Sequence, residues 1–294
     1  MSALSEPLKV KSGIYITHLY DVNFSKKSVN AIFWLWFIYP TDSDFKNYFS
    51  IDNSENSKVL FSESKTFDDG TTWKAHQVQA TLYQNWSFEH FPNGEHQLKI
   101  IVGDYEHTAK TMQYIPDVKS SDVDNEMKLN GWVLGEDSIV TELRDYDTNF
   151  GYPGLTIEDS VYPKLVYTVD MEQSNTKLFF KIFGLLYLAC FLILCVYFVP
   201  IDDLKSRLAL NSAAIFSVVG NKLATDDILP PSQILTLIDK LQLYTLALMV
   251  LLLGLVVTLN IIQKRNLILA KRLNILFGLL SFLAILVATF LYVI

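Results

Sequence analysis

Residues 206–231 read SRLALNSAAIFSVVGNKLATDDILPP, and this stretch decides how the rest of the chain is interpreted. Small and apolar residues recur in it at intervals of three and four, which is the spacing of one helix face. The residues of this stripe are Ser206, Ala209, Ala213, Phe216, Gly220 and Leu223. Polar side chains, among them Asn211 and Asn221, lie between them. Because hydrocarbon offers no hydrogen-bond partner, the pattern predicts a helix enclosed by protein or water rather than by lipid alone.

Two interpretations of this helix remain open. In the first, copies of the helix surround an axis, and the stripe of small residues lines a pore. In the second, the helix is an inner member of a membrane bundle, and its small residues only allow close packing. The spacing alone favours the second interpretation.

The composition divides the chain into two parts. Its 294 residues are 50% hydrophobic, with a mean hydropathy of +0.24, which is too apolar for an ordinary soluble protein of this size. Residues 1–176 form a polar, acidic part, and residues 177–294 are mostly apolar. The formal net charge of −7 arises in the first part and argues against nucleic-acid binding. Residues 1–11 contain no apolar segment typical of a signal peptide, which suggests a mature or truncated N-terminus.

The first part is expected to be a β-sandwich. Residues 8–40 are rich in β-branched and aromatic side chains and end at Pro40. Residues 41–70 are polar and predict loops around a short strand at 59–61. Residues 73–102 predict two alternating strands that flank a Pro-Asn-Gly turn, and the last strand before the membrane is expected at 165–169.

The second part is expected to be a four-helix transmembrane bundle. About 20 helical residues cross a bilayer core of about 30 Å. The four predicted spans are 178–199, 204–225, 235–262 and 273–294. The connection 263–272 carries four basic residues and no acidic one, so the positive-inside rule assigns it to the cytoplasm. The chain is therefore expected to be a multi-pass protein of the plasma (inner) membrane with its N-terminal domain outside.

Short motifs in both parts bear on the identity of the fold. The membrane part contains Ser206-Arg207-Leu208, Asp227-Ile228-Leu229-Pro230 and Ile238-Asp239. The polar part contains Pro7-Leu8, Gly13-Ile14-Tyr15-Ile16, Val29-Asn30-Ala31 and Leu129-Asn130-Gly131-Trp132. Together they resemble the motifs of prokaryotic pentameric ligand-gated ion channels, and the resemblance covers nearly the whole chain. It implies a homopentamer in lipid whose outer domain binds a ligand and whose second helix lines a pore for permeant ions.

The resemblance implies which residues line that pore. They are the stripe residues and one more at the outer end, namely Ser206, Ala209, Ala213, Phe216, Gly220, Leu223 and Asp227. A ring of Phe216 with Ala213 below it would form an apolar constriction that gates by dewetting. Asp226 and Asp227 at the outer mouth favour cations, whereas Arg207 is more often turned from the pore in this family.

The resemblance also implies a ligand site. Residues 146–162 match the position of the family's capping loop, whose aromatic side chains close over ligands by stacking and cation–π attraction. The candidates are Phe150, Tyr152 and Tyr162. The expected ligand is an unidentified small molecule or a proton. A solvated hairpin tip with incidental aromatic residues explains this segment equally well.

Coupling between the outer domain and the pore is implied for Phe91, Pro92 and Pro230. Phe91 and Pro92 match part of the family's aromatic-Pro-aromatic-Asp turn, in which Asn93 and Gly94 replace the last two residues. Pro230 lies in the loop that follows the second helix.

An alternative function is a pentameric membrane sensor or assembly subunit with the channel fold and no conduction. Three departures from the family pattern favour it. Residues 41–70 contain no Trp-x-Pro motif, the turn at 91–94 lacks its aspartate, and the first span lacks the usual proline. Ser206 also stands where cation-selective members carry glutamate.

An enzyme is not expected. No nucleophile–base pair, metal cluster or phosphate-binding loop stands out in the sequence, so neither a cofactor nor a metal is predicted. His90, His96 and His107 have no zinc-site spacing and are interpreted as strand-surface residues. Cys190 and Cys195 both lie in the first span, so the polar part holds no disulfide.

Overall fold

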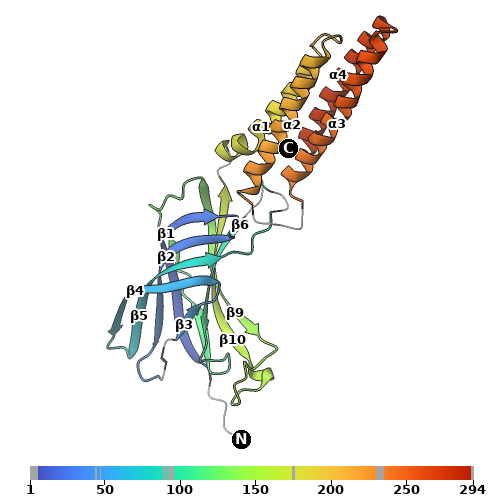
Figure 1. The fold of residues 1–294 in the computed structure, drawn as a ribbon. Coiled ribbons are helices and arrows are strands. Elements are labelled where there is room, and N and C mark those ends of the chain that lie inside the picture. The colour runs from blue at the N-terminus through green and yellow to red at the C-terminus, as the bar shows by residue number, and fades with distance from the viewer. Residues whose placement is uncertain are drawn as a thin grey trace. The chain divides into compact units, whose positions relative to one another are not determined.

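The computed structural model describes residues 6–43, 45–46, 48–88, 91, 96–173, 176–229 and 235–292. The chain divides into two compact units, shown by the strands and the helices of Figure 1. The β unit comprises Met1–Trp86 and Glu95–Gln173, and the helical unit comprises Ser87–Gly94 and Ser174–Ile294. The predicted boundary at 176 thus lies near the change from strands to helices, but the short Ser87–Gly94 segment groups with the helices.

The larger sheet of the β unit has the strand order β4-β5-β2-β1-β7, and β8 also pairs with β1. Its strands are β1 (Leu8–Asn23), β2 (Ser28–Pro40), β4 (Ser54–Thr66), β5 (Thr71–Tyr83), β7 (Met112–Pro116) and β8 (Asp122–Val123). The β1–β2, β2–β5 and β5–β4 pairs are antiparallel, whereas β7 and β8 run parallel to β1.

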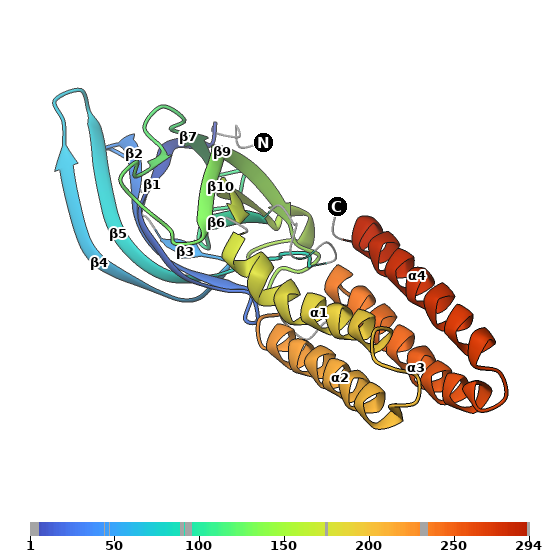
Figure 2. The same ribbon diagram turned by 90° about the horizontal axis from the view of Figure 1, so that it is seen from above.

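The smaller sheet has the order β3-β6-β10-β9 and is antiparallel throughout. Its strands are β3 (Phe49–Ile51), β6 (His96–Asp104), β10 (Val161–Gln173) and β9 (Trp132–Asp145). A turn of 3-10 helix, η1 (Ile157–Asp159), precedes β10. Figure 2 shows the two sheets as separate layers of the β unit.

The core of the β unit consists of the inward side chains of both sheets. In β2 every second residue is buried, as in Phe33, Leu35 and Phe37, and β6 follows the same alternation with Leu98 and Ile100. A period of two residues is what a half-buried strand requires. The predicted β-sandwich is therefore confirmed for the N-terminal part of the chain.

The prediction of loops across 41–70 is wrong for β3 and for most of β4, a long strand that extends well beyond the short strand expected at 59–61. From Glu55 to Thr66 its residues are all exposed, and its backbone pairs with β5. β4 is an edge strand that is held by backbone hydrogen bonds to one neighbour, so it needs no apolar face. Its polar sequence therefore gave no strand pattern outside 59–61.

His76 is a buried, titratable group in the β unit. Its side chain is 7% exposed, its Nδ1 lies 2.7 Å from the Ser62 hydroxyl, and its ring lies 5.0 Å from that of Phe49. Burial, reinforced by the charge of Lys74, lowers the pKa of His76 from 6.5 to about 4. At a pH between these two pKa values, His76 is protonated in the unfolded chain and neutral in the folded chain. Acidification over this range therefore favours unfolding.

We therefore expect His76 to lower the free energy of unfolding by roughly 3 kcal/mol as the pH drops from 6.5 to 4. His76→Gln should remove this part of the pH dependence, whereas the exposed His18→Gln should not. The five tryptophans lie at positions 34, 36, 73, 86 and 132, so denaturation followed by tryptophan fluorescence reports on the β unit. Equal slopes against pH in wild type and His76→Gln would contradict the assignment.

His96 is not a strand-surface residue, contrary to the sequence prediction. It is 3% exposed, and its ring packs 5.2 Å from Phe24, 5.6 Å from Trp86 and 5.8 Å from Trp132. Burial lowers the pKa of His96. His107 lies beside Asp104, with Nδ1 3.0 Å from the carboxylate, and His90 lies outside the described residues.

Four helices follow the strands in the described part of the chain: α1 (Thr176–Val196), α2 (Leu204–Asp226), α3 (Leu237–Gln263) and α4 (Leu267–Tyr292). Helix α1 packs on α2, α2 on α3, and α3 on α4. A capping box between Thr236 and Asp239 fixes the start of α3. Two of the described helices, Leu237–Gln263 and Leu267–Leu291, are long and apolar enough to cross a membrane.

Helix α4 begins at Leu267, six residues before the predicted span at 273. The predicted connection 263–272 is therefore mostly helical. The residues between α3 and α4 are only Lys264, Arg265 and Asn266, and Asn266 accepts a hydrogen bond from the backbone N–H of Leu269 through its side chain. An asparagine at this place is a typical helix start, which the sequence analysis overlooked.

Candidate functional site

Helix α2 has two faces of opposite character, and its buried face carries polar side chains. The buried residues are Arg207, Asn211, Ala214, Val218, Asn221 and Thr225. Polar groups are costly inside a bundle unless they are hydrogen-bonded. Their partners on the neighbouring helices therefore fix how α2 packs.

Arg207 anchors the first turn of α2. It is fully buried, its Nε donates to the carbonyl of Val196 over 3.1 Å, and its Nη2 donates to Asn274 Oδ1. Asn274 in turn donates to the carbonyl of Tyr197 over 2.8 Å. One charged side chain thus joins the end of α1 and the first turns of α4 to the start of α2, and its guanidinium points into the protein rather than to the exposed face.

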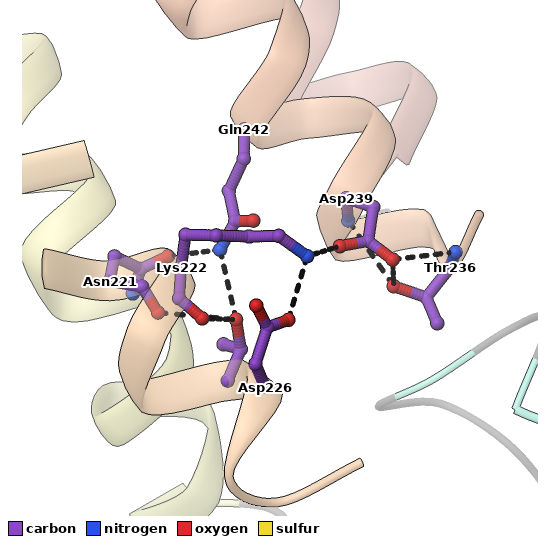
Figure 3. A network of polar contacts seen from close by, with 7 residues as sticks. Asn221, Lys222, Asp226, Thr236, Asp239 and Gln242 are labelled. Atoms are coloured by element: carbon purple, nitrogen blue, oxygen red, sulfur yellow. Dashed lines mark hydrogen bonds and ion pairs between the residues drawn. The ribbon is translucent and has the colours of Figure 1, made fainter. Parts of the chain in front are cut away.

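A second polar group lies near the other end of α2. Asn221 donates to the carbonyl of Ile182 in α1 and accepts from Gln242 Nε2 in α3 over 2.7 Å. The same Gln242 nitrogen lies 3.2 Å from Thr225 Oγ1. Figure 3 shows Asn221 and Gln242 between the helices that they connect. These bonds tie α2 to both of its neighbours at one level, and we name Asn221, Thr225 and Gln242 the amide cluster.

Lys222 forms an ion-pair group next to the amide cluster. Its Nζ lies 2.7 Å from Asp226 in the next turn of α2 and 2.5 Å from Asp239 in α3 (Figure 3). Asp239 also accepts hydrogen bonds from the backbone N–H and hydroxyl of Thr236. The end of α2 is therefore tied to the start of α3 by charge as well as by the buried amides.

The opposite face of α2 is the predicted stripe. Its exposed members are Ser206, Ala209, Ala213, Phe216, Leu223 and Asp227, and Gly220 is half-buried. Phe216 is 75% and Leu223 is 66% exposed, and a Cβ added at Gly220 would meet nothing within 4 Å. Within the described residues, nothing in the chain itself covers this face.

The capping loop between β9 and β10 is held in shape by Asn149. Its side chain accepts from the backbone N–H of Gly151 and donates to the carbonyls of Tyr152 and Leu155. Phe150 adopts φ 54°, in the left-handed region that non-glycine residues rarely occupy. Phe150 and Tyr152 are 64% and 65% exposed, so this fixed turn presents two large aromatic rings to solvent.

The structure places the three predicted ligand residues around one cavity. Phe150, Tyr152 and Tyr162 line an open space of about 810 Å³ in the β unit. The rings of Tyr146, Phe150 and Tyr162 form a cluster with centroids 5.2 to 6.4 Å apart. We name this space the capping-loop cavity.

Three charged residues that were not predicted from the sequence also line this cavity, namely Arg144, Lys164 and Asp52. Lys164 Nζ lies 2.6 Å from Asp52, and Arg144 lies over the ring of Tyr146. Arg144 pairs with Tyr162 across β9 and β10, and Lys164 lies two residues further along β10. The alternation of side chains along a β9–β10 hairpin was the available signal, but it required the register of the two strands.

Of the predicted coupling residues, only Phe91 lies within the described part of the chain. It is 1% exposed, and its ring lies 6.3 Å from that of Phe88. Both belong to the Ser87–Gly94 segment, which groups with the helical unit. Pro92 and Pro230 lie outside the described residues.

No protein-family model and no curated protein matches the chain. A functional proposal therefore depends on two features described above. They are the exposed face of α2 and the capping-loop cavity.

Proposed function

We propose that the chain is one subunit of a homopentameric ligand-gated ion channel and that α2 lines its axial pore. The observation that carries the proposal is the division of α2 into two faces. Its buried polar groups bond to α1, α3 and α4, while the stripe of small residues is left exposed. Five copies around an axis would turn these stripes toward one another.

The composition of the helices supports a water-filled axis next to α2. Helices α3 and α4 are apolar enough to face lipid. In contrast, α2 is not among the described helices that are this apolar, and it exposes Lys205, Ser206, Ser212, Asp226 and Asp227. Exposed charged groups are costly against hydrocarbon and are tolerated beside water. We propose that all four helices cross the membrane as one bundle, with residues 1–173 and the Asp226–Asp227 end of α2 outside.

The stripe provides the parts of a gate and a weak selectivity filter. A ring of Phe216 side chains would narrow the axis with apolar surface, and such constrictions close by dewetting. A ring of Asp227 at the outer end would raise the local concentration of cations, whereas the charge of Asp226 is offset by Lys222. Because Arg207 is buried, its side chain would not line the axis.

In this proposal the capping loop carries the ligand response. Phe150, Tyr152 and Tyr162 would contact the ligand, and Phe91, Pro92 and Pro230 would transmit the change to the pore. The fixed shape of the loop around Asn149 supports a recognition role, because preorganised surfaces lose less conformational freedom on binding.

Two measurements test the proposal. Native mass determination in mild detergent should give five copies of the 33.6 kDa chain, and a clean monomer or dimer would contradict it. Purified protein in planar bilayers should carry a current. A pentamer that never conducts, either as wild type or with the gate substitution Phe216→Ser, would favour the non-conducting sensor instead.

A further inference from the structure

The capping-loop cavity combines aromatic walls with two basic side chains, and their arrangement indicates the ligand class. The cavity is about 810 Å³ in volume, which falls within the range of sites for small organic molecules. Amines and carboxylates are two charged groups that such a site could select. The positions of Lys164 and Arg144 distinguish between them.

Lys164 already occupies the place that an amine ligand would take. Its Nζ lies 5.8 Å from the ring centroid of Tyr146 and 5.9 Å from that of Tyr162, within cation–π range of both. The side chain is 8% exposed and is paired with Asp52 over 2.6 Å. The aromatic faces are thus filled by the ammonium group of the protein itself.

The backbone is built around this ion pair. Lys164 and Asp52 meet over Gly103, which pairs with Lys164 in β10 and with Ser50 in β3. A Cβ at Gly103 would lie 2.5 Å from Asp52 Oδ1 and 2.6 Å from Lys164 Nζ. Any larger residue would displace one of these side chains, so the glycine leaves the room in which this largely buried pair forms.

Arg144 is the basic group that remains open to a ligand. Its guanidinium carbon lies 5.3 Å from the centroid of the Tyr146 ring, and the side chain is exposed. Among the described residues, no carboxylate lies within ion-pair distance of it. A guanidinium presents its N–H groups in a planar fork that matches a carboxylate.

The acidic residues of the cavity do not compete for this role. Asp52 is paired with Lys164. Asp104 is only 1% exposed: its Oδ1 accepts from the backbone N–H groups of Glu106 and His107, and its Oδ2 is buried without a partner among the described residues. Glu106 is exposed, where water and salt screen its charge. Arg144 therefore provides an unpaired positive charge beside apolar surface.

We infer that the capping-loop cavity binds a small organic carboxylate, with Arg144 holding the carboxylate group and Phe150 and Tyr152 covering the apolar part. The inference deepens the proposed function, on which its link to channel opening rests. The exposed rings of Phe150 and Tyr152 would be buried on binding, which supplies apolar contact area in addition to the charge-assisted hydrogen bonds.

The test compares two probes of similar shape and opposite charge, benzoate and benzylamine, by calorimetry on the purified full-length protein. Benzoate should bind at least about tenfold more tightly than benzylamine. Arg144→Gln should weaken benzoate binding by about tenfold or more, and Arg144→Lys, which keeps the charge but not the fork, should weaken it less. Unchanged tryptophan fluorescence would show that the variants are folded.

Lys65→Gln is the matched control, because Lys65 lies on β4, away from the cavity, and its Nζ is also 5.3 Å from the centroid of an aromatic ring, that of Phe67. It should leave benzoate binding unchanged. Tighter binding of benzylamine, no binding of benzoate, or an Arg144→Gln variant that binds benzoate like wild type would each overturn the inference. The readout does not involve current, so benzoate binding by a pentamer that never conducts would contradict the proposed function alone.

Discussion

Phe216→Ser is expected to raise the spontaneous current of the assembled channel or its sensitivity to ligand. Phe216 is the largest residue of the exposed α2 face, and five copies would close the axis with apolar rings. Burying one such side chain is worth about 1.5–3 kcal/mol, and five are removed together. A shift of only about 1.4 kcal/mol toward the wetted state would raise the open fraction of a mostly closed channel about tenfold.

Controls for Phe216→Ser come from the same helix. Val219 is also exposed but lies beside the stripe, so Val219→Ser should change the current much less. Val218 is 3% exposed, and Val218→Ser places a hydroxyl inside the bundle. We therefore expect this change to lower the stability of the helical unit rather than to raise the current. Equal currents from Phe216→Ser and Val219→Ser, measured in planar bilayers with equal assembly, would exclude Phe216 as the gate.

The sequence was most informative where a periodic pattern ran for many residues. The intervals in residues 206–227 placed Phe216 and Leu223 on one face, and in the structure both are exposed there. The same pattern could not show what the polar residues between them do. Asn221 bonds to Ile182 and Gln242, which lie 39 and 21 residues away, and no local spacing reports such partners.

The capping-loop cavity shows the same limit. The aromatic residues Phe150, Tyr152 and Tyr162 could be selected because they are close in sequence. Arg144 and Lys164 could not, because their positions depend on the register of β9, β10 and β6. Charged side chains at strand positions read as ordinary surface residues until the pairing brings them to one place.

Loss of the amide cluster is expected to destabilise the helical unit. Asn221→Leu keeps the approximate shape of the side chain but removes the bond to Ile182 and leaves Gln242 with one partner fewer. Leaving a buried amide unsatisfied costs about 1–3 kcal/mol. The same reasoning applies to Gln242→Met, because Asn221 then loses the donor of its side-chain oxygen.

The double variant Asn221→Leu/Gln242→Met removes both partners, so it should cost less than the sum of the single changes. Interhelical hydrogen bonds in membranes measure about 0.6 kcal/mol on average and about 1.7 kcal/mol at most, which sets the expected size of the coupling. Thermal or denaturant unfolding of the four proteins in one detergent, followed by helical circular dichroism, would measure it.

Asn260→Leu is the matched control for the amide cluster, because Asn260 donates one bond to the carbonyl of Ile201 and is only half-buried. It should cost less than Asn221→Leu and should add to Gln242→Met without coupling, because Asn260 and Gln242 lie five helical turns apart on α3. Strict additivity of Asn221→Leu and Gln242→Met would show that the amide cluster does not act as a unit.

The amide cluster also bears on channel opening in the proposed function. It bonds α2 to α1 and α3, so a tilt of α2 that opens the axis would stretch or exchange these bonds. The double variant Asn221→Leu/Gln242→Met lacks these bonds, so its channel should open more readily than that of the wild type.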